Sequence, residues 1–147
     1  LLNKARELNV PIFHITHHGA ENGQVFDPLS ANVDIVSDLQ PQDNETIITK
    51  KHPNAFYETQ LDAFIKKVQK QQIIFAGFMS HMCVSSSVRA AFDLGFDNVV
   101  CHDACATRDL PSAQRETISA EMMHDTAMAA LQDRFAALVT TNDLING

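Results

Sequence analysis

The feature that most constrains the fold is a repeated change in the spacing of apolar residues along the chain. From Thr59 onward, apolar residues recur at positions 61, 64, 65 and 68, the spacing of one face of a helix. The next run, residues 72–78, is apolar almost throughout, as a strand covered on both faces should be. A helix followed by a buried strand is typical of parallel sheets, because the chain must cross over between parallel strands.

The same change of spacing divides the rest of the chain. It predicts further strands at residues 10–15, 45–49, 98–102 and 137–141, and further helices at residues 1–8, 83–94 and 114–135. Residues 17–41, punctuated by glycine and proline, predict a long loop over a binding face. We therefore expect an α/β fold, a three-layer α/β/α arrangement with a mostly parallel, Rossmann-like sheet and right-handed crossovers.

Length and charge narrow the class of protein. A chain of 147 residues fits one domain, which we expect to span residues 1–147. No apolar run approaches the roughly 20 residues that cross a bilayer, so we expect no membrane partner and a cytoplasmic location. A net charge of −7 and a pI near 5.3 argue against a nucleic-acid partner. The expected partner is a small-molecule substrate.

Three cysteines without a C-x-x-C spacing do not resemble a disulfide framework or a zinc site. In open parallel sheets, chemistry gathers at the carboxyl ends of the strands, and Cys83 follows the strand 72–78 by a short turn. Backbone N–H groups at the start of the following helix would favour a thiolate and could hold an oxyanion. From position alone, packing remains the commoner role of a cysteine. Packing is also our interpretation of Cys101 and Cys105.

Lys50 stands directly after the strand 45–49, where its side chain would project into the same crevice. An ammonium there would lower the pKa of a thiol and stabilise a developing anion. The alternative is a solvated pair, Lys50 and Lys51, that ends the strand. The residues themselves leave both interpretations open.

The order of these segments resembles a known family. GFMSHMCV (residues 77–84), AAFDLG (90–95) and DA (103–104) are similar to the nucleophile segment of isochorismatase-like cysteine hydrolases. Residues 50–61 resemble that family's lysine segment, and His124 with residues 129–131 suits its C-terminal part. The resemblance covers nearly the whole chain and has both motifs in the expected order.

The resemblance implies an Asp-Lys-Cys triad in which Cys83 is the nucleophile and Lys50, rather than Lys51, is the lysine. The family's aspartate segment has no match in residues 1–147, so we expect the aspartate and a first central strand to precede Leu1. Asp103 matches a different segment, with a structural role. The resemblance also implies a cis bond between Phe78 and Met79, and an oxyanion site formed by the backbone N–H groups of Met79 and Cys83.

Further site residues follow from position and from the resemblance. We expect Phe56, Tyr57, His17 and His81 to line the substrate pocket. The alternatives are a solvated His17 and a His81 that is only a turn residue hydrogen-bonded to the backbone. The nicotinamidase branch of the family binds a metal through Asp-x-His-x-x-His, whereas the corresponding residues here are Thr16, His18 and Glu21. Because the first carboxylate and the last imidazole are both replaced, we expect neither a metal nor another cofactor.

The activity implied by the resemblance is hydrolysis of a non-peptide C–N bond in a small amide, through a thioester on Cys83. One alternative is an isochorismatase proper, which cleaves a vinyl ether and needs no cysteine nucleophile. Another is a catalytically silent α/β domain used for binding or assembly. The expected substrate is a small amide of no further specified class. The family resemblance alone suggests a homo-oligomer.

Overall fold

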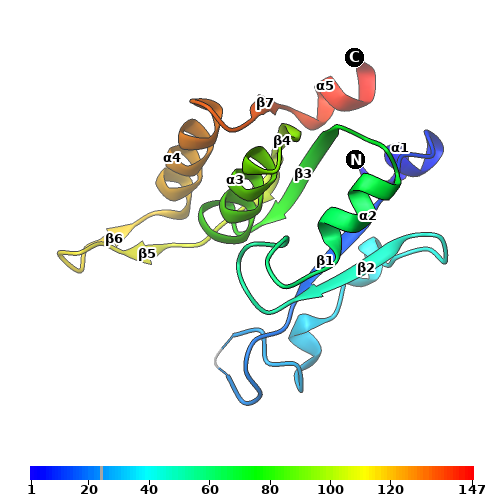
Figure 1. Ribbon diagram of the computed structural model, residues 1–147. Helices are drawn as coiled ribbons and strands as arrows, with labels where there is room; N and C mark the ends of the chain where they lie inside the picture. Colours follow the sequence, from blue (N-terminus) through cyan, green and yellow to red (C-terminus); the bar gives the residue numbers. More distant parts are fainter. Residues whose placement is uncertain (24) are drawn as a thin grey trace. The chain divides into compact units, whose positions relative to one another are not determined.

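The computed structural model describes residues 1–23 and 25–147 (Figure 1). Its α-helices are α1 (Leu2–Glu7), α2 (Leu61–Lys67), α3 (Ser85–Asp93), α4 (Ala120–Gln132) and α5 (Thr141–Asn146). Its strands are β1 (Phe13–His17), β2 (Thr46–Lys50), β3 (Gln72–Phe78), β4 (Asp97–Ala106), β5 (Leu110–Pro111), β6 (Thr117–Ile118) and β7 (Ala137–Val139). Strands pair in parallel except in the short β5–β6 ladder, so the predicted α/β class is confirmed.

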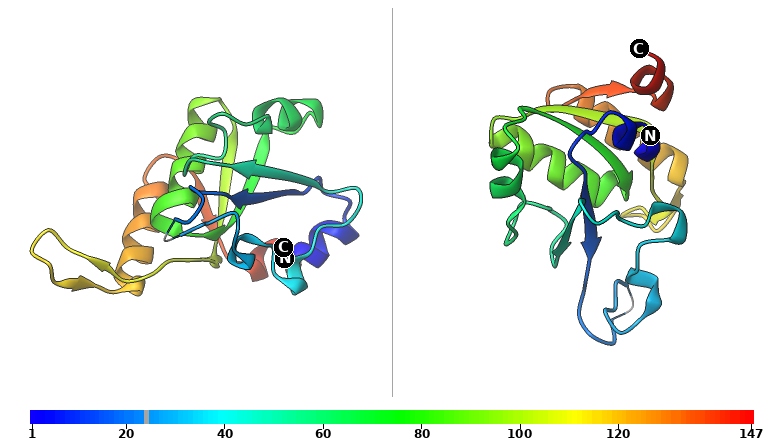
Figure 2. Two further views of the ribbon diagram at one scale, coloured as in Figure 1. Left: turned by 90° about the horizontal axis from the view of Figure 1, so that it is seen from below. Right: turned by 90° about the vertical axis from the view of Figure 1, so that its right-hand side faces the viewer.

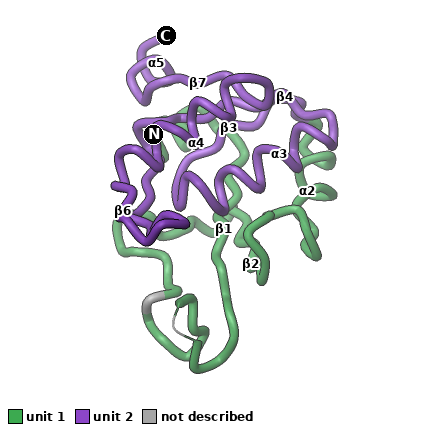
Figure 3. Tube along the Cα trace, turned by 90° about the vertical axis from the view of Figure 1, so that its left-hand side faces the viewer, with its two compact units in different colours: residues 1–69 green, residues 70–147 purple. Residues whose placement is uncertain are grey.

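The chain forms two compact units, residues 1–69 and 70–147, which Figure 3 colours separately. Two short 3₁₀ turns, η1 (Ala31–Val33) and η2 (Ser37–Leu39), interrupt the expected long loop of the first unit. None of the helices in the described residues is both long and apolar enough to span a bilayer.

In the first unit, β1 and β2 form a parallel pair that runs from Phe13 opposite Thr46 to His17 opposite Lys50. The carboxyl ends of both strands therefore lie side by side. Helix α2 buries Leu61 and Ile65, which belong to the apolar helix face predicted from the sequence. The charged residues Asp62, Lys66 and Lys67 occupy other positions of the helix.

A cluster of three polar side chains joins the segments at the amino-terminal end of this strand pair. Arg6 of α1 donates from Nε to Oε1 of Glu45 at 2.7 Å, and His14 of β1 lies 2.7 Å from Oε2 through its Nε2. The Glu45 carboxylate also accepts from the backbone N–H of Gln42 at 2.9 Å. Its side chain is only 4% exposed, so one buried carboxylate joins α1, β1 and the start of β2.

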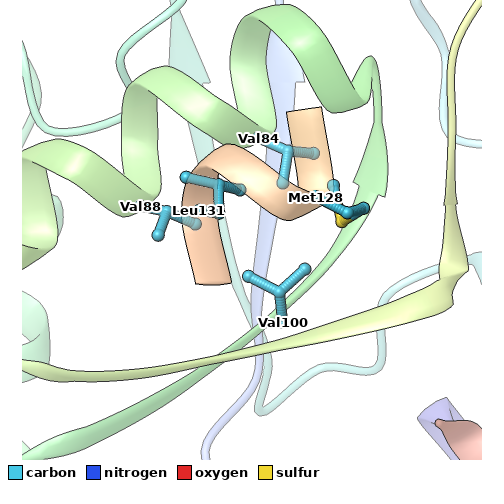
Figure 4. Close-up of a cluster of buried hydrophobic side chains, with 5 residues drawn as sticks. All are labelled: Val84, Val88, Val100, Met128 and Leu131. Carbon is cyan, nitrogen blue, oxygen red and sulfur yellow. The ribbon is translucent and has the colours of Figure 1, made fainter. Parts of the chain in front are cut away.

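In the second unit, the parallel order is β3–β4–β7, and the register between β3 and β4 shifts between Phe75 and Gly77. Helices α3 and α4 pack against this sheet through an apolar cluster shown in Figure 4. The cluster consists of Val84, Val88, Val100, Met128 and Leu131. One of these side chains, Val84, comes from the turn between β3 and α3, and the others come from α3, β4 and α4. Packing in the core therefore fixes the position of that turn.

The structure moves several predicted boundaries. The helix expected at residues 114–135 begins only at Ala120, because Ser119 caps it by accepting from the N–H of Met122 at 3.2 Å. The residues before Ser119 instead form the antiparallel β5–β6 hairpin, which projects from the body of the second unit (Figures 1 and 2). The last strand ends at Val139, and α5 follows it, a helix that the sequence pattern did not predict.

Candidate active site

Cys83 lies in a π-helical turn, η3 (Ser80–Val84), between the end of β3 and the start of α3. The backbone N–H groups of Met82 and Val84 donate to the carbonyl of Met79 at 3.0 and 3.2 Å, which closes the turn. The side chain of Cys83 is buried, with 8% of its surface exposed. The helix expected to start at Cys83 therefore starts two residues later, at Ser85, because the wider π-turn comes first.

The expected cis peptide bond is present between Phe78 and Met79. It lies where β3 ends and the Cys83 turn begins. The further expectation, that the N–H groups of Met79 and Cys83 form an oxyanion site, stays a prediction.

Ser80 anchors the same turn to helix α4. Its side chain is fully buried, and its Oγ lies 2.8 Å from Nδ1 of His124. The sequence associated His124 with the family's C-terminal part but gave it no contact, because the two residues are 44 positions apart. The only available signal was a polar residue, Ser80, two positions after the apolar run of β3, whose residues are alternately exposed and half-buried in the structure rather than covered on both faces as expected.

His81 also belongs to this turn and is hydrogen-bonded through Nδ1 to the hydroxyl of Thr107. Thr107 follows β4, whose residue Ala106 pairs with Phe78, so the ends of the two strands bring these residues together. Partial burial, and secondarily the charge of Arg108, lowers the pKa of His81 below its ordinary value. Both effects favour the neutral form of the His81 imidazole. Its predicted role in lining the pocket stays a prediction.

The two other thiols have surroundings that suit packing. Burial raises the pKa of Cys105 to about 11, and burial also raises the pKa of the fully buried Cys101. Asp103, beside Cys101, accepts from the N–H and the hydroxyl of Thr141 at 2.7 and 2.9 Å. These bonds hold the start of α5, in keeping with the structural role expected for Asp103.

In the first unit, Lys50 is buried at the end of β2, with 4% of its surface exposed. Its Nζ donates to Nδ1 of His17 at 3.0 Å and to the carbonyl of His52 at 2.9 Å. The neighbouring Lys51 is exposed. The alternative of two solvated lysines therefore fails for Lys50. Burial distinguishes Lys50 from Lys51, and the family motif selects the same residue.

His17, the last residue of β1, holds a fixed ring beside Lys50. The ring stacks on Phe26 with a centroid separation of 4.4 Å and an interplanar angle of 6°. Burial, and then the charge of Lys50, lowers the pKa of His17 below 6.5. His17 is therefore neutral at pH 7, as an acceptor of a lysine hydrogen bond must be.

The loop after Lys50 carries the two predicted aromatic residues. The N–H of Phe56 donates to the side chain of Asn54 at 2.9 Å, and Tyr57 is 52% exposed with its ring edge-on to His52 at 4.8 Å. Nothing in these contacts tests a pocket role, which stays a prediction for both. Within residues 1–23 and 25–147, no three side chains of His, Cys, Asp or Glu cluster as a metal site requires.

The candidate residues thus form two groups. One group is Lys50 with His17 at the ends of β1 and β2, and the other is Cys83 with Ser80 and His81 after β3. Both groups follow the carboxyl ends of parallel strands, where α/β proteins build their sites. Lysine and cysteine are each residue types that take part in nucleophilic chemistry.

Comparison with known proteins decides the family. The family model described as the isochorismatase domain matches residues 1–143. The chain belongs to the isochorismatase family. A secreted isochorismatase effector, Isc1, of Verticillium dahliae is 33% identical over 144 residues, which cover 98% of this chain and 73% of the relative. The crystal structure of an isochorismatase from Pseudomonas putida is 37% identical with a TM-score of 0.91, covering 97% of this chain and 72% of that one.

Other relatives carry names that state a hydrolytic reaction. A streptothricin hydrolase of Streptomyces noursei is 31% identical over 135 residues, which cover 90% of this chain and 49% of the relative. The ureidoacrylate amidohydrolase RutB of Pantoea ananatis is 32% identical over 85 residues, which cover 58% of this chain and 34% of the relative. The chain is thus a member of a hydrolase family that includes an amidohydrolase.

Proposed function

We propose that this protein hydrolyses a non-peptide C–N bond of a small amide, with Cys83 as the nucleophile and Lys50 as its cationic partner. The observation that carries the proposal is the burial of Lys50 at a strand end, 4% exposed, where a structural lysine would be solvated. The buried Cys83 at the end of β3 and the similarity to a ureidoacrylate amidohydrolase add support. A buried cation and a thiol in this motif order favour thiolate chemistry.

In the proposed first step, the Cys83 thiol gives its proton to an aspartate base, the triad member that the family resemblance predicts and no residue of this sequence matches. The thiolate attacks the amide carbonyl, a C–S bond forms, and the carbonyl oxygen becomes an oxyanion. The N–H groups of Met79 and Cys83 hold that oxyanion. The C–N bond then breaks, and the amine leaves with the proton held by the aspartate.

In the second step, water attacks the thioester after losing a proton to the same base. The C–S bond breaks, the acid product leaves, and the proton returns to the Cys83 sulfur. Lys50 keeps the site electropositive, which favours the thiolate before attack and each anionic intermediate after it. The neutral His81 lines the pocket in this scheme.

The test is release of ammonia or amine from a panel of small amides by the full-length protein that carries this chain, as wild type and as Cys83→Ala. We expect the substitution to lower kcat by about 10³-fold or more, because it removes the only proposed nucleophile. Cys105→Ala is the matched control, since it removes another thiol next to β3. It should retain wild-type turnover.

Trapping with a slow substrate should give a covalent adduct on Cys83, located by peptide mass spectrometry. Amide hydrolysis that persists in Cys83→Ala would contradict the mechanism. Hydrolysis of a vinyl ether, unaffected by the same substitution, would favour the isochorismatase reaction instead. A thiol that reacts with iodoacetamide only at ordinary rates, together with no hydrolysis, would favour a silent binding domain.

A further inference from the structure

The Lys50 ammonium is held by the side chain of His17, a residue to which the proposed triad gives no role. His17 and Lys50 are opposite each other in the parallel pair β1–β2, so both side chains leave the sheet at the same end. The 3.0 Å contact joins Lys50 Nζ to His17 Nδ1, and the 2.9 Å bond to the carbonyl of His52 gives the ammonium a second acceptor. Two acceptors on different segments fix the direction of a side chain that otherwise has four rotatable bonds.

We propose that His17 is a positioning residue for Lys50: its imidazole accepts a hydrogen bond from the ammonium and so holds the positive charge in place. The inference rests on the proposed function, because Lys50 matters to turnover only there. An ammonium has donors alone, so His17 must offer an unprotonated Nδ1 and carry its proton on Nε2. The ring is thus required in one tautomer.

Phe26 supports the ring that accepts this bond. The stacked rings lie 4.4 Å apart, and the N–H of Gly19 donates to the carbonyl of Phe26 at 2.7 Å. That backbone bond brings the chain back to the end of β1, where Phe26 covers one face of the imidazole. The stack restricts rotation of the His17 ring, so its Nδ1 stays directed at Lys50.

The charged groups around His17 favour the neutral ring. Burial acts first, the charge of Lys50 second, and His52 and His18 add smaller repulsions, whereas a hydrogen bond to the backbone of Lys51 acts in the opposite direction. The net effect lowers the pKa of His17 below 6.5. When the pH falls through that lowered pKa, Nδ1 gains a proton, the bond to Lys50 is lost, and two cations face each other.

Three substitutions distinguish the role of the His17 hydrogen-bond acceptor from that of its aromatic ring. His17→Phe keeps an aromatic ring for Phe26 but has no acceptor. His17→Asn offers an amide oxygen near the place of Nδ1 and does not titrate. His18→Asn is the matched control, because it makes the same change at the adjacent histidine, whose backbone N–H donates to the carbonyl of Lys50. Circular dichroism and a thermal melt of each variant check that it folds.

In turnover of the amide substrate, His17→Phe should lower kcat about ten- to a hundredfold, the effect of losing one hydrogen bond to a charged group, with little change in KM. His17→Asn should regain most of that kcat. Its acid-side fall in kcat should also start at a lower pH than in the wild type, because residue 17 no longer gains a proton. His18→Asn should match the wild type. Equal losses in His17→Asn and His17→Phe, with an unchanged acid limb, would overturn the positioning role.

A second measurement needs no activity. An amine-labelling reagent applied to the full chain, followed by peptide mass spectrometry, gives the labelling rate of Lys50 relative to the exposed Lys51. The ratio should rise in His17→Phe and return toward wild type in His17→Asn. If the wild type hydrolyses no amide, the proposed function fails while this ratio still tests the contact. A ratio that is the same in all variants would overturn the inference.

Discussion

Ser80 has no exposed surface, yet it carries a hydroxyl in the turn that holds Cys83. Its 2.8 Å bond to His124 joins that turn to helix α4. Ser80→Ala removes the hydroxyl that is hydrogen-bonded to Nδ1 of His124. We therefore expect the free energy of unfolding to fall by about 1–3 kcal/mol. Urea unfolding followed by circular dichroism measures this change.

Two neighbouring variants make the Ser80 prediction specific. Ser80→Thr keeps the hydroxyl and should lose less stability than Ser80→Ala. Ser86→Ala, at a half-buried serine of α3, should change the free energy of unfolding by less than about 0.5 kcal/mol. If Ser80→Ala were as stable as Ser86→Ala, the bond to His124 would not hold the turn.

At the scale of elements, Glu45 is the residue through which α1, β1 and β2 meet. Hydrogen bonds, the largest from Arg6, hold the pKa of its carboxyl well below the ordinary 4.5. A lowered carboxyl pKa adds stability above pH 4.5, and that stability is lost as the pH falls toward the folded-state pKa. Glu45→Gln should therefore lower the urea midpoint at pH 7 and show a smaller further loss at acid pH.

Glu7→Gln is the control for the Glu45 substitution. Glu7 lies on α1 and its contact with Lys4 spans 3.7 Å, but its side chain is 67% exposed. Exposed ion pairs add little to stability, so its urea midpoint should stay close to wild type at both pH values. Equal acid sensitivity of Glu45→Gln and the wild type would show that another group causes the acid loss.

Apolar spacing located β2 and β3 closely, whereas it did not locate helix starts that are set by capping residues, as at Ser119 and Thr140. The apolar run of β3 has the predicted bounds, Gln72–Phe78, and β2 differs by one residue at each end. Helix α5 was missed although its start has a local signal, a capping box in which the Thr140 and Asp143 side chains each accept from the other's backbone N–H. Periodicity carries no trace of such a bond.

In the candidate site, the sequence identified the candidate residues but not the contacts between them. Cys83 and Lys50 became candidates because each follows a strand in a recognisable motif, and the burial of Lys50 excludes its solvated alternative. Their catalytic roles stay predictions. The contacts of His17 with Lys50 and Phe26 were not predicted, since strand register and the path of a loop decide them. Sequence identifies the residue types that can react, whereas the folded chain supplies the partners that orient them.

For the whole molecule, charge and exposed apolar surface determine how copies of the chain interact. The net charge is −7 with all seven histidines neutral, and the pI is near 5.3. As the pH falls from 7 toward the pI, the net negative charge decreases and the repulsion between copies weakens. Phe78, Leu29 and Val25 are 73%, 69% and 65% exposed, so attraction between apolar side chains remains.

We therefore expect a solubility minimum near pH 5.3, measured as light scattering across a pH series at constant ionic strength. The lowered pKa of His17 acts in the same range, because the unfolded chain gains a proton near pH 6.5 while the folded chain resists it, so stability falls as the pH falls. Replacing the exposed Lys51 and Lys66 by Glu makes the chain more acidic and should move the minimum to lower pH. A minimum that stays at the same pH in this variant would show that acid unfolding, rather than loss of net charge, brings the copies together.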